Sequence, residues 1–325
     1  MLRSRGIKPY REEFKFILTA ENQEERLQYA RERQGWTMEE WKNCGFTDEM
    51  SIEIGGTFGP NTVWRDKGER WHTDCTGAKR KGGASVMCWG LIGYGFKGPF
   101  FVWDAETDAE KKADNAIIKE HNDKVMAQLL KDTEEWKKTS EWQQLRETEL
   151  AATRVQRAAE RAGAPKVQMT HRHKARKYEV LTWQRSKKGG IDSWRYVKCL
   201  ARPILWPYCK EQLRINPNFQ LMEDNAPAHK SPYTTHYRTL EQIPKILWPR
   251  NSPDFNPIER IWTLMKRRIQ RRRGTERITT MGEMKRVLQE EWDKITIEEI
   301  NREVEKLPTI MQRCIDVNGN NNYHA

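Results

Sequence analysis

The chain has 325 residues, and its 58 lysines and arginines against 46 aspartates and glutamates give a formal charge of +12 at pH 7. No run approaches the roughly 18–20 apolar residues of a membrane helix, and the length allows one large domain or two modest ones. The start lacks the apolar core of a secretory signal, and the six cysteines form no CxxC pair, so we expect an intracellular protein with reduced thiols. The positive charge favours a polyanion partner, nucleic acid first.

The first third of the chain changes from helical to strand-like patterning. Residues 19–43 are predicted to form a helix with Thr19 as N-cap. Between residues 45 and 103, short apolar or aromatic runs are separated by glycine-rich turns. This pattern predicts an antiparallel meander of at least three strands.

Residues 105–163 are highly charged and contain no proline. They predict a long solvated helical stretch, broken once and folded back as a hairpin. Residues 166–188 that follow are strongly basic. The whole 105–190 segment could brace a dimer, grip a DNA backbone, or be only a solvated outgrowth. The candidate DNA-binding side chains in it are Lys174, Arg176, Lys177, Lys187 and Lys188.

The last third alternates helices and strands. We expect helices at 194–213, 230–242 and 258–270, a strand at 218–224 that ends in a polar tip, and a buried strand at 243–249. The apolar positions of the 258–270 helix lie on one face: Ile258, Ile261, Trp262, Met265 and Ile269. Thr296 and Glu299 have the spacing of a capping box that opens a final helix.

Three acids stand out by position. Asp48 lies in the first strand, Asp224 follows the 218–224 strand, and Glu259 lies in a first helical turn, with Asn256 as the expected N-cap and Pro257 as the first-turn residue. Each acid alone is more typical of a solvated turn or a cap. Together they could meet at one sheet edge, where three carboxylates would repel one another unless Mg²⁺ or Mn²⁺ were bound. Two such ions can activate a water or a 3′-hydroxyl in phosphodiester displacement.

The residues around these acids resemble a known family. FTDE, VWR, GERWH, GGASVMCWGLIGYGFKGPFFVW, MEDNAPAH and WPRNSPDFNPIERIW look like the catalytic domain of mariner-type transposases, in the Tc–mariner superfamily of DDE transposases. The 34 residues between Asp224 and Glu259 match the spacing of one branch of that superfamily. SPDFNPIE with DNAPAH at this spacing is a specific signal, whereas FTDE alone would be weak. The resemblance spans most of the chain outside 105–190.

The resemblance implies an α/β, RNase H-like mixed sheet flanked by helices, with 105–190 as a long helical insertion. It implies metal-dependent cleavage of DNA at transposon ends and strand transfer into target DNA by cut-and-paste, with two Mg²⁺ or Mn²⁺ ions, a homodimer on DNA and a nuclear location. By this resemblance, Asp48, Asp224 and Glu259 match the metal-binding triad. The motif positions around them are Asn225, His229, Ser252, Pro253, Asp254, Asn256 and Pro257.

Other assignments depend on the same resemblance. We interpret Asp254 as supporting the helix entry or the site from behind, and we expect Glu49 and Glu223 to point away from the triad if they lie in strands. Family members usually begin with a helix-turn-helix region, of which LRSRGIKP resembles only the tail. We therefore expect residues 1–18 to be a remnant of it, and 19–104 and 191–325 to be the two parts of the catalytic domain.

A basic run follows Glu259 along the same helix. Such a run is often only a solvated face or a nuclear-import signal, but next to a site acting on DNA it favours phosphate contact. Two rival hypotheses remain: a catalytically silent transposon-derived DNA-binding or scaffold protein, and a host nuclease on the same fold. The basic side chains are Lys266, Arg267, Arg268, Arg271, Arg272 and Arg273.

Overall fold

The computed structural model describes residues 18–54, 84–163, 182–186 and 190–321. Its centre is a four-stranded sheet in the order β3-β2-β1-β4. β1 pairs antiparallel with β2 and parallel with β4, and β2 pairs antiparallel with β3. The predicted meander is therefore confirmed as the first three strands of a mixed sheet. The strands are β1 (Cys44–Glu53), β2 (Ser85–Gly93), β3 (Phe96–Val102) and β4 (Gln220–Met222).

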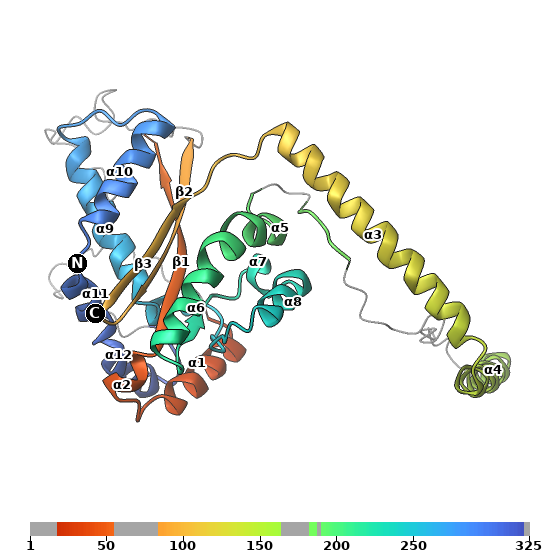
Figure 1. The fold of residues 1–325 in the computed structure, drawn as a ribbon. Coiled ribbons are helices and arrows are strands. Elements are labelled where there is room, and N and C mark those ends of the chain that lie inside the picture. Colours follow the sequence, from red (N-terminus) through yellow and green to blue (C-terminus); the bar gives the residue numbers. More distant parts are fainter. Residues whose placement is uncertain (1–17, 55–83, 164–181, 187–189, 322–325) are drawn as a thin grey trace, which may run out of the picture.

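Helices cover both faces of this sheet (Figure 1). One face carries α9 (Ile258–Arg273), α10 (Met281–Asp293) and α11 (Ile297–Val304), with α12 (Leu307–Asp316), α1 (Ala20–Glu32) and α2 (Met38–Trp41) at one end. The other face carries α5 (Ser193–Arg195), the π-helix η3 (Tyr196–Leu205), α6 (Trp206–Ile215), α7 (Pro227–Lys230) and α8 (Pro232–Leu240). A short 3₁₀ turn, η4 (Pro253–Phe255), leads towards α9.

The alternation of β2 divides the interior into two hydrophobic clusters. Cys88 and Ile92 point to the cluster under α9–α12, whereas Trp89 and Leu91 point to the cluster under η3 and α6. This is the period-two pattern of a strand that is buried on both faces. Gly90 has no side chain because the rings of Trp262 and Trp292 occupy that space; a Cβ there would lie 2.8 Å from each ring.

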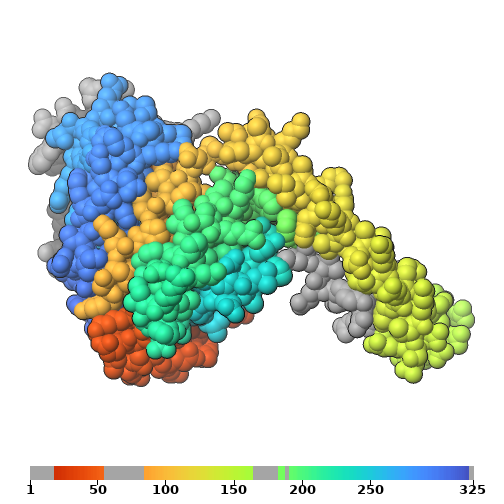
Figure 2. Space-filling model, in the orientation of Figure 1, coloured from red at the N-terminus to blue at the C-terminus, as the bar shows by residue number. Residues whose placement is uncertain are grey.

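The predicted insertion forms an arm that stands apart from the body (Figure 2). It consists of α3 (Asp108–Trp136) and α4 (Ser140–Arg161), so the single break in the helical stretch is confirmed. The hairpin prediction is wrong, because α4 lies across the far end of α3 and does not run back beside it. A hairpin needs a shared apolar seam, and α4 buries none of its residues.

The base of the arm is fixed to the body. The Asn122 side chain exchanges two hydrogen bonds with the Trp183 backbone, at 2.9 Å each. The ring of Trp183 also stacks on His121, with ring centroids 3.5 Å apart, and packs against Trp194 and Tyr233. The chain therefore leaves and rejoins the body at touching residues.

Several predicted element boundaries need correction. The helix expected over 19–43 is two helices, because Gly35 lies in the turn that separates α1 from α2. The helix over 194–213 contains a π-helical segment around Pro203, which has no N–H to continue an α pattern. The helix over 230–242 is interrupted at Ser231, whose hydroxyl accepts a bond from the Thr234 N–H and starts α8.

The buried strand predicted over 243–249 is wrong as a strand. Ile243, Ile246 and Trp248 are buried, but the segment makes only one bridge, between Lys245 and Leu221 of β4. The helix at 258–270 and its single buried face are confirmed, as is the capping box of Thr296 and Glu299. None of the helices in the described ranges has the length and apolar character needed to span a bilayer.

Candidate active site

The three acids singled out from the sequence line one cleft of about 430 Å³ at the edge of the sheet. Asp48 lies in the middle of β1, and Asp224 comes two residues after the end of β4. Phe46 opposes Met222 in the parallel pairing of β1 and β4, so continuing that register by two residues sets Asp48 opposite Asp224. α9 packs on β1 and β2, and its first turn brings Glu259 to the same cleft.

Asp48 and Glu259 are close enough for each carboxyl group to affect the pKa of the other. Two neighbouring carboxyl groups repel each other when both are ionised, so one of them tends to keep a proton. Burial, then the nearby charges of Glu259 and Glu49, raise the pKa of Asp48 to about 8. Burial also raises the pKa of Glu259. The pair therefore retains a proton at neutral pH, which is the electrostatic strain that a divalent cation would relieve.

Asp224 lies in the opposite electrostatic environment. Its Oδ1 is 2.7 Å from Nδ1 of His229 and accepts a 2.8 Å bond from the Ala226 N–H. Burial alone would raise the pKa of Asp224, but the His229 contact, the Ala226 N–H and the Lys245 charge together lower it. Asp224 is thus an ionised carboxylate that could bind a cation, beside the pair of Asp48 and Glu259 that retains a proton.

His229 links two strands behind the cleft. Its Nε2 lies 3.3 Å from Glu49 of β1, while its Nδ1 contacts Asp224. Burial would lower the pKa of His229, but the two carboxylates raise it to about 10, so the imidazole is charged. Glu49 points to His229, whereas Asp48 points to α9, as the alternation of a strand requires.

The motif residues between Asp224 and Glu259 hold the walls of the cleft. Nδ2 of Asn225 donates to the Trp248 carbonyl at 2.8 Å, and Nδ2 of Asn256 donates to the Thr47 carbonyl at 3.0 Å. Asn256 was expected as the N-cap of α9, and its Oδ1 does accept the Ile258 N–H at 3.4 Å, with Asn256 extended and Pro257 already helical. Ser252 donates to the Arg250 carbonyl at 3.0 Å, and Pro253 begins η4.

Asp254 faces away from the triad. It forms a two-pronged ion pair with Arg26 of α1, with both N–O distances at 2.7 Å. Arg26 is fully buried, and its Nε donates to the Gly319 carbonyl. The pair ties both ends of the described chain to the loop before α9. Asp254 therefore supports the entry of α9 and is not placed to bind a cation in the cleft.

Glu223 is also separate from the cleft. It is completely buried and is bonded by the Tyr196 hydroxyl and by Arg238 at 2.8 Å, with Lys245 at 3.3 Å. Burial would raise the pKa of Glu223, but His229, Lys245 and Arg238 lower it. The expectation that Glu223 points away from the triad agrees with this network.

Sequence reasoning missed Trp262 as part of the site. Its Nε1 donates to Oδ2 of Asp48 at 3.1 Å, which fixes the orientation of that carboxyl. Trp262 was predicted only as a core residue of α9. The available signal was its spacing, because residues three apart on a helix are neighbours and Trp262 is three after Glu259.

The oxygen-rich cleft fits hard divalent cations. Within the described ranges, no set of three or more His, Cys, Asp or Glu side chains converges closely enough to enclose an ion. The contacts account for this: Asp224 turns to His229, and Asp48 accepts a hydrogen bond from Trp262. Carboxylates from three elements around one cleft are nevertheless the donor type that Mg²⁺ and Mn²⁺ prefer.

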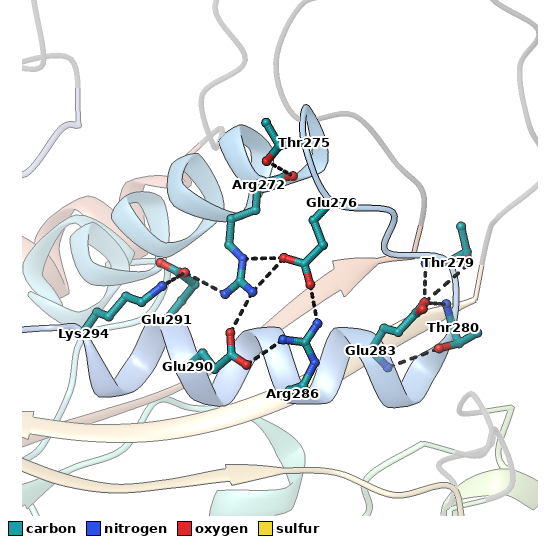
Figure 3. Close-up of polar contacts among 10 residues, drawn as sticks. All are labelled: Arg272, Thr275, Glu276, Thr279, Thr280, Glu283, Arg286, Glu290, Glu291 and Lys294. Atoms are coloured by element: carbon teal, nitrogen blue, oxygen red, sulfur yellow. Dashed lines mark hydrogen bonds and ion pairs between the residues drawn. The ribbon is translucent and has the colours of Figure 1, made fainter.

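The predicted DNA-binding residues fall into two groups. Lys174, Arg176, Lys177, Lys187 and Lys188 lie outside the described residues. On α9, Arg272 pairs with Glu276, Glu290 and Glu291 in the network of Figure 3, and Arg268 pairs with Glu299 at 2.6 Å. Arg273 donates to the Glu53 carbonyl. Lys266 is half-buried, and Arg267 and Arg271 are exposed.

Comparison with known proteins identifies the fold. Structures of the Mos1 strand transfer complex and of the Mos1 paired-end complex with left transposon end align with 98% of this chain and 68% of theirs. Their TM-scores are 0.60 and 0.59, at 13% sequence identity. The mixed sheet with flanking helices is therefore the RNase H-like fold, as the sequence predicted.

Sequence comparison finds relatives among transposases. The model for DDE superfamily endonucleases matches residues 152–281. Tcb1 transposase of Caenorhabditis briggsae is 20% identical over 305 residues, which is 93% of this chain and 78% of Tcb1. The chain is therefore similar in sequence to DDE endonucleases and to transposases of the Tc1/mariner type. Tc1 transposase of Caenorhabditis elegans is 29% identical to this chain over 105 residues, 32% of the chain, and that match spans 37% of Tc1 transposase.

Proposed function

We propose that this chain is a transposase catalytic domain that cuts DNA phosphodiester bonds at transposon ends and joins those ends to target DNA. The observation that carries the proposal is the shared cleft of Asp48, Asp224 and Glu259. Two rival functions, a silent binding protein and a host nuclease, have less support, because the triad is intact and the sequence is similar to DDE endonucleases and to a transposase.

The three acids would hold two Mg²⁺ or Mn²⁺ ions. When bound, such ions activate a water or a 3′-hydroxyl and stabilise the leaving oxygen. The protein's own residues prepare the site: Trp262 orients Asp48, and His229 holds Asp224 as an ionised donor. Lys230 and Arg250 line the same cleft, where their charges suit a DNA phosphate.

The partners and location are part of the same proposal. DNA would be both the transposon end and the target, and the protein would act as a homodimer on DNA, with the α3–α4 arm as the candidate brace. A substrate of this kind supports a nuclear location, which imaging of the tagged chain would test.

Substitution of Asp224 tests the catalytic proposal. We expect Asp224→Asn to lower Mn²⁺-dependent nicking of supercoiled DNA by about 1,000-fold, since loss of one ion site removes several kcal/mol of transition-state stabilisation. The matched control is Asp316→Asn, an exposed aspartate on α12, which should nick at the wild-type rate. Thermal unfolding of both variants should match wild type within a few degrees.

One result would replace this proposal with its rival. If wild type and Asp224→Asn were equally inert with Mg²⁺ and Mn²⁺, yet both bound DNA, the protein would be a DNA-binding or scaffold protein without catalysis.

A further inference from the structure

A second concavity, of about 680 Å³, lies on the side of α9 away from the catalytic cleft. We call it the α9–α12 groove, because residues of α9, α11 and α12 line it. Asn256 lines both the groove and the cleft, so the loop before α9 separates the two. The basic side chains lining the groove are Arg260, Arg267, Arg302, Lys306 and Arg313.

The acids in this groove are already neutralised by other partners. Asp254 pairs with Arg26, Glu299 pairs with Arg268, and Glu303 pairs with Lys306, all at 2.6–2.7 Å. Four arginines of the groove are left without an acidic partner in the described structure: Arg260, Arg267, Arg302 and Arg313. All four are exposed. The groove therefore presents uncompensated positive charge.

The arginines lie in two stripes that face each other across the groove. Arg260 and Arg267 are seven residues apart on α9, which puts them on one face and about 10.5 Å apart along the helix axis. That separation is the axial length of about three nucleotides of one strand of duplex DNA. Arg302 and Arg313 follow the opposite wall along α11 and α12.

We infer that the α9–α12 groove binds the phosphate backbone of double-stranded DNA. Guanidinium groups match phosphate oxygens in a two-pronged geometry, and four of them are available here. No aromatic side chain lines the groove among the described residues, so it offers no platform for stacking unpaired bases. The inference deepens the proposed function, because it assigns a holding site for DNA that lies on the catalytic helix but outside the cleft.

Salt dependence of DNA binding tests this site without catalysis. The affinity of the full chain for a fluorescent 30-base-pair duplex would be measured by anisotropy in EDTA at several salt concentrations. Each lost phosphate contact lowers the slope of log affinity against log salt by about 0.9. We expect Arg302→Gln and Arg313→Gln to lower it singly by that amount and together by about twice as much, with Arg302→Lys near wild type.

The matched control is Arg214→Gln, which removes one exposed charge from α6 on the other face of the sheet. It should leave the slope unchanged. If the double variant keeps the wild-type slope while wild type still nicks DNA with Mn²⁺, the groove inference is overturned and the proposed function stands. If wild type binds no duplex at any salt concentration, both are overturned.

Discussion

Asp48 shows how one residue links the chemistry of the cleft to the stability of the fold. Its pKa is raised to about 8 in the folded chain, against an ordinary value near 3.9. The folded state therefore binds more protons than the unfolded state between about pH 4 and pH 8, and stability falls as the pH rises through that window. Ionisation of Asp48 thus destabilises the folded chain when nothing neutralises its charge.

The Asp48→Asn side chain cannot ionise, so this substitution removes the fall in stability with rising pH. In EDTA, we expect Asp48→Asn to melt above wild type, with a difference that grows from pH 5 to about pH 8.5 and reaches at least about 2 °C. Differential scanning calorimetry over this range measures it. Glu53→Gln, an exposed change on the same strand, should show no such trend. A constant offset for Asp48→Asn at every pH would contradict the explanation.

At the same scale, the sequence predicted which acids share a cleft better than it predicted how they are held. Asp48, Asp224 and Glu259 were recognisable because each lies in a distinctive motif. The contacts of His229 with Asp224 and Glu49 were not, because they depend on β1 and α7 meeting across some 180 residues of chain. The capping bond of Asn256 to Ile258 was predictable from the local sequence, whereas its second bond, to the Thr47 carbonyl, was not.

At the scale of elements, the apolar pattern predicted helices with one buried face correctly. It was less reliable for a segment that pairs with the sheet at a single residue. The stripe of α9 was predicted residue by residue, because its period is a property of the helix alone. The segment 243–249 has the composition of a buried strand, yet only Lys245 pairs with β4. Burial of its alternate side chains satisfies the apolar pattern without requiring a ladder of hydrogen bonds.

The outer arm is the element most separate from the core, and its removal is a direct test. We expect replacement of residues 125–181 by a short Gly/Ser linker to change the melting temperature by less than about 3 °C, since Asn122 already contacts Trp183 and α4 buries nothing. Light scattering of the deletion on DNA would also show whether the arm braces a dimer.

A substitution at the inner end of the arm is the contrasting control. Ile118 is buried in the cluster with η3 and α6. Ile118→Ala should therefore lower the free energy of unfolding by about 2–4 kcal/mol in denaturant titrations. A deletion that proved as destabilising as Ile118→Ala would show that the outer arm is part of the folding unit.

At the scale of the molecule, two hydrophobic clusters fix the sheet from both sides and leave three acids at its edge. Cation binding to the folded state alone would stabilise the whole chain, by about 2.7 kcal/mol at a concentration 100 times the Kd. We therefore expect saturating Mn²⁺ to raise the melting temperature by about 4 °C and EDTA to reverse the change. Glu211→Gln on α6 should keep this shift, and Glu259→Gln should lose most of it. Equal shifts in both variants would place the ion elsewhere.

The two hydrogen bonds between Asn122 and Trp183 bring together the ends of the segment between them, so that this segment is a side branch of the fold. Lengthening, shortening or replacing that branch changes the number of residues between Asp48 and Asp224 without changing any path through the sheet that brings them together. The catalytic edge and the branch are therefore free to diverge at different rates, and a lineage could exchange the whole branch for a new accessory module in one genetic event while the acids stay in register.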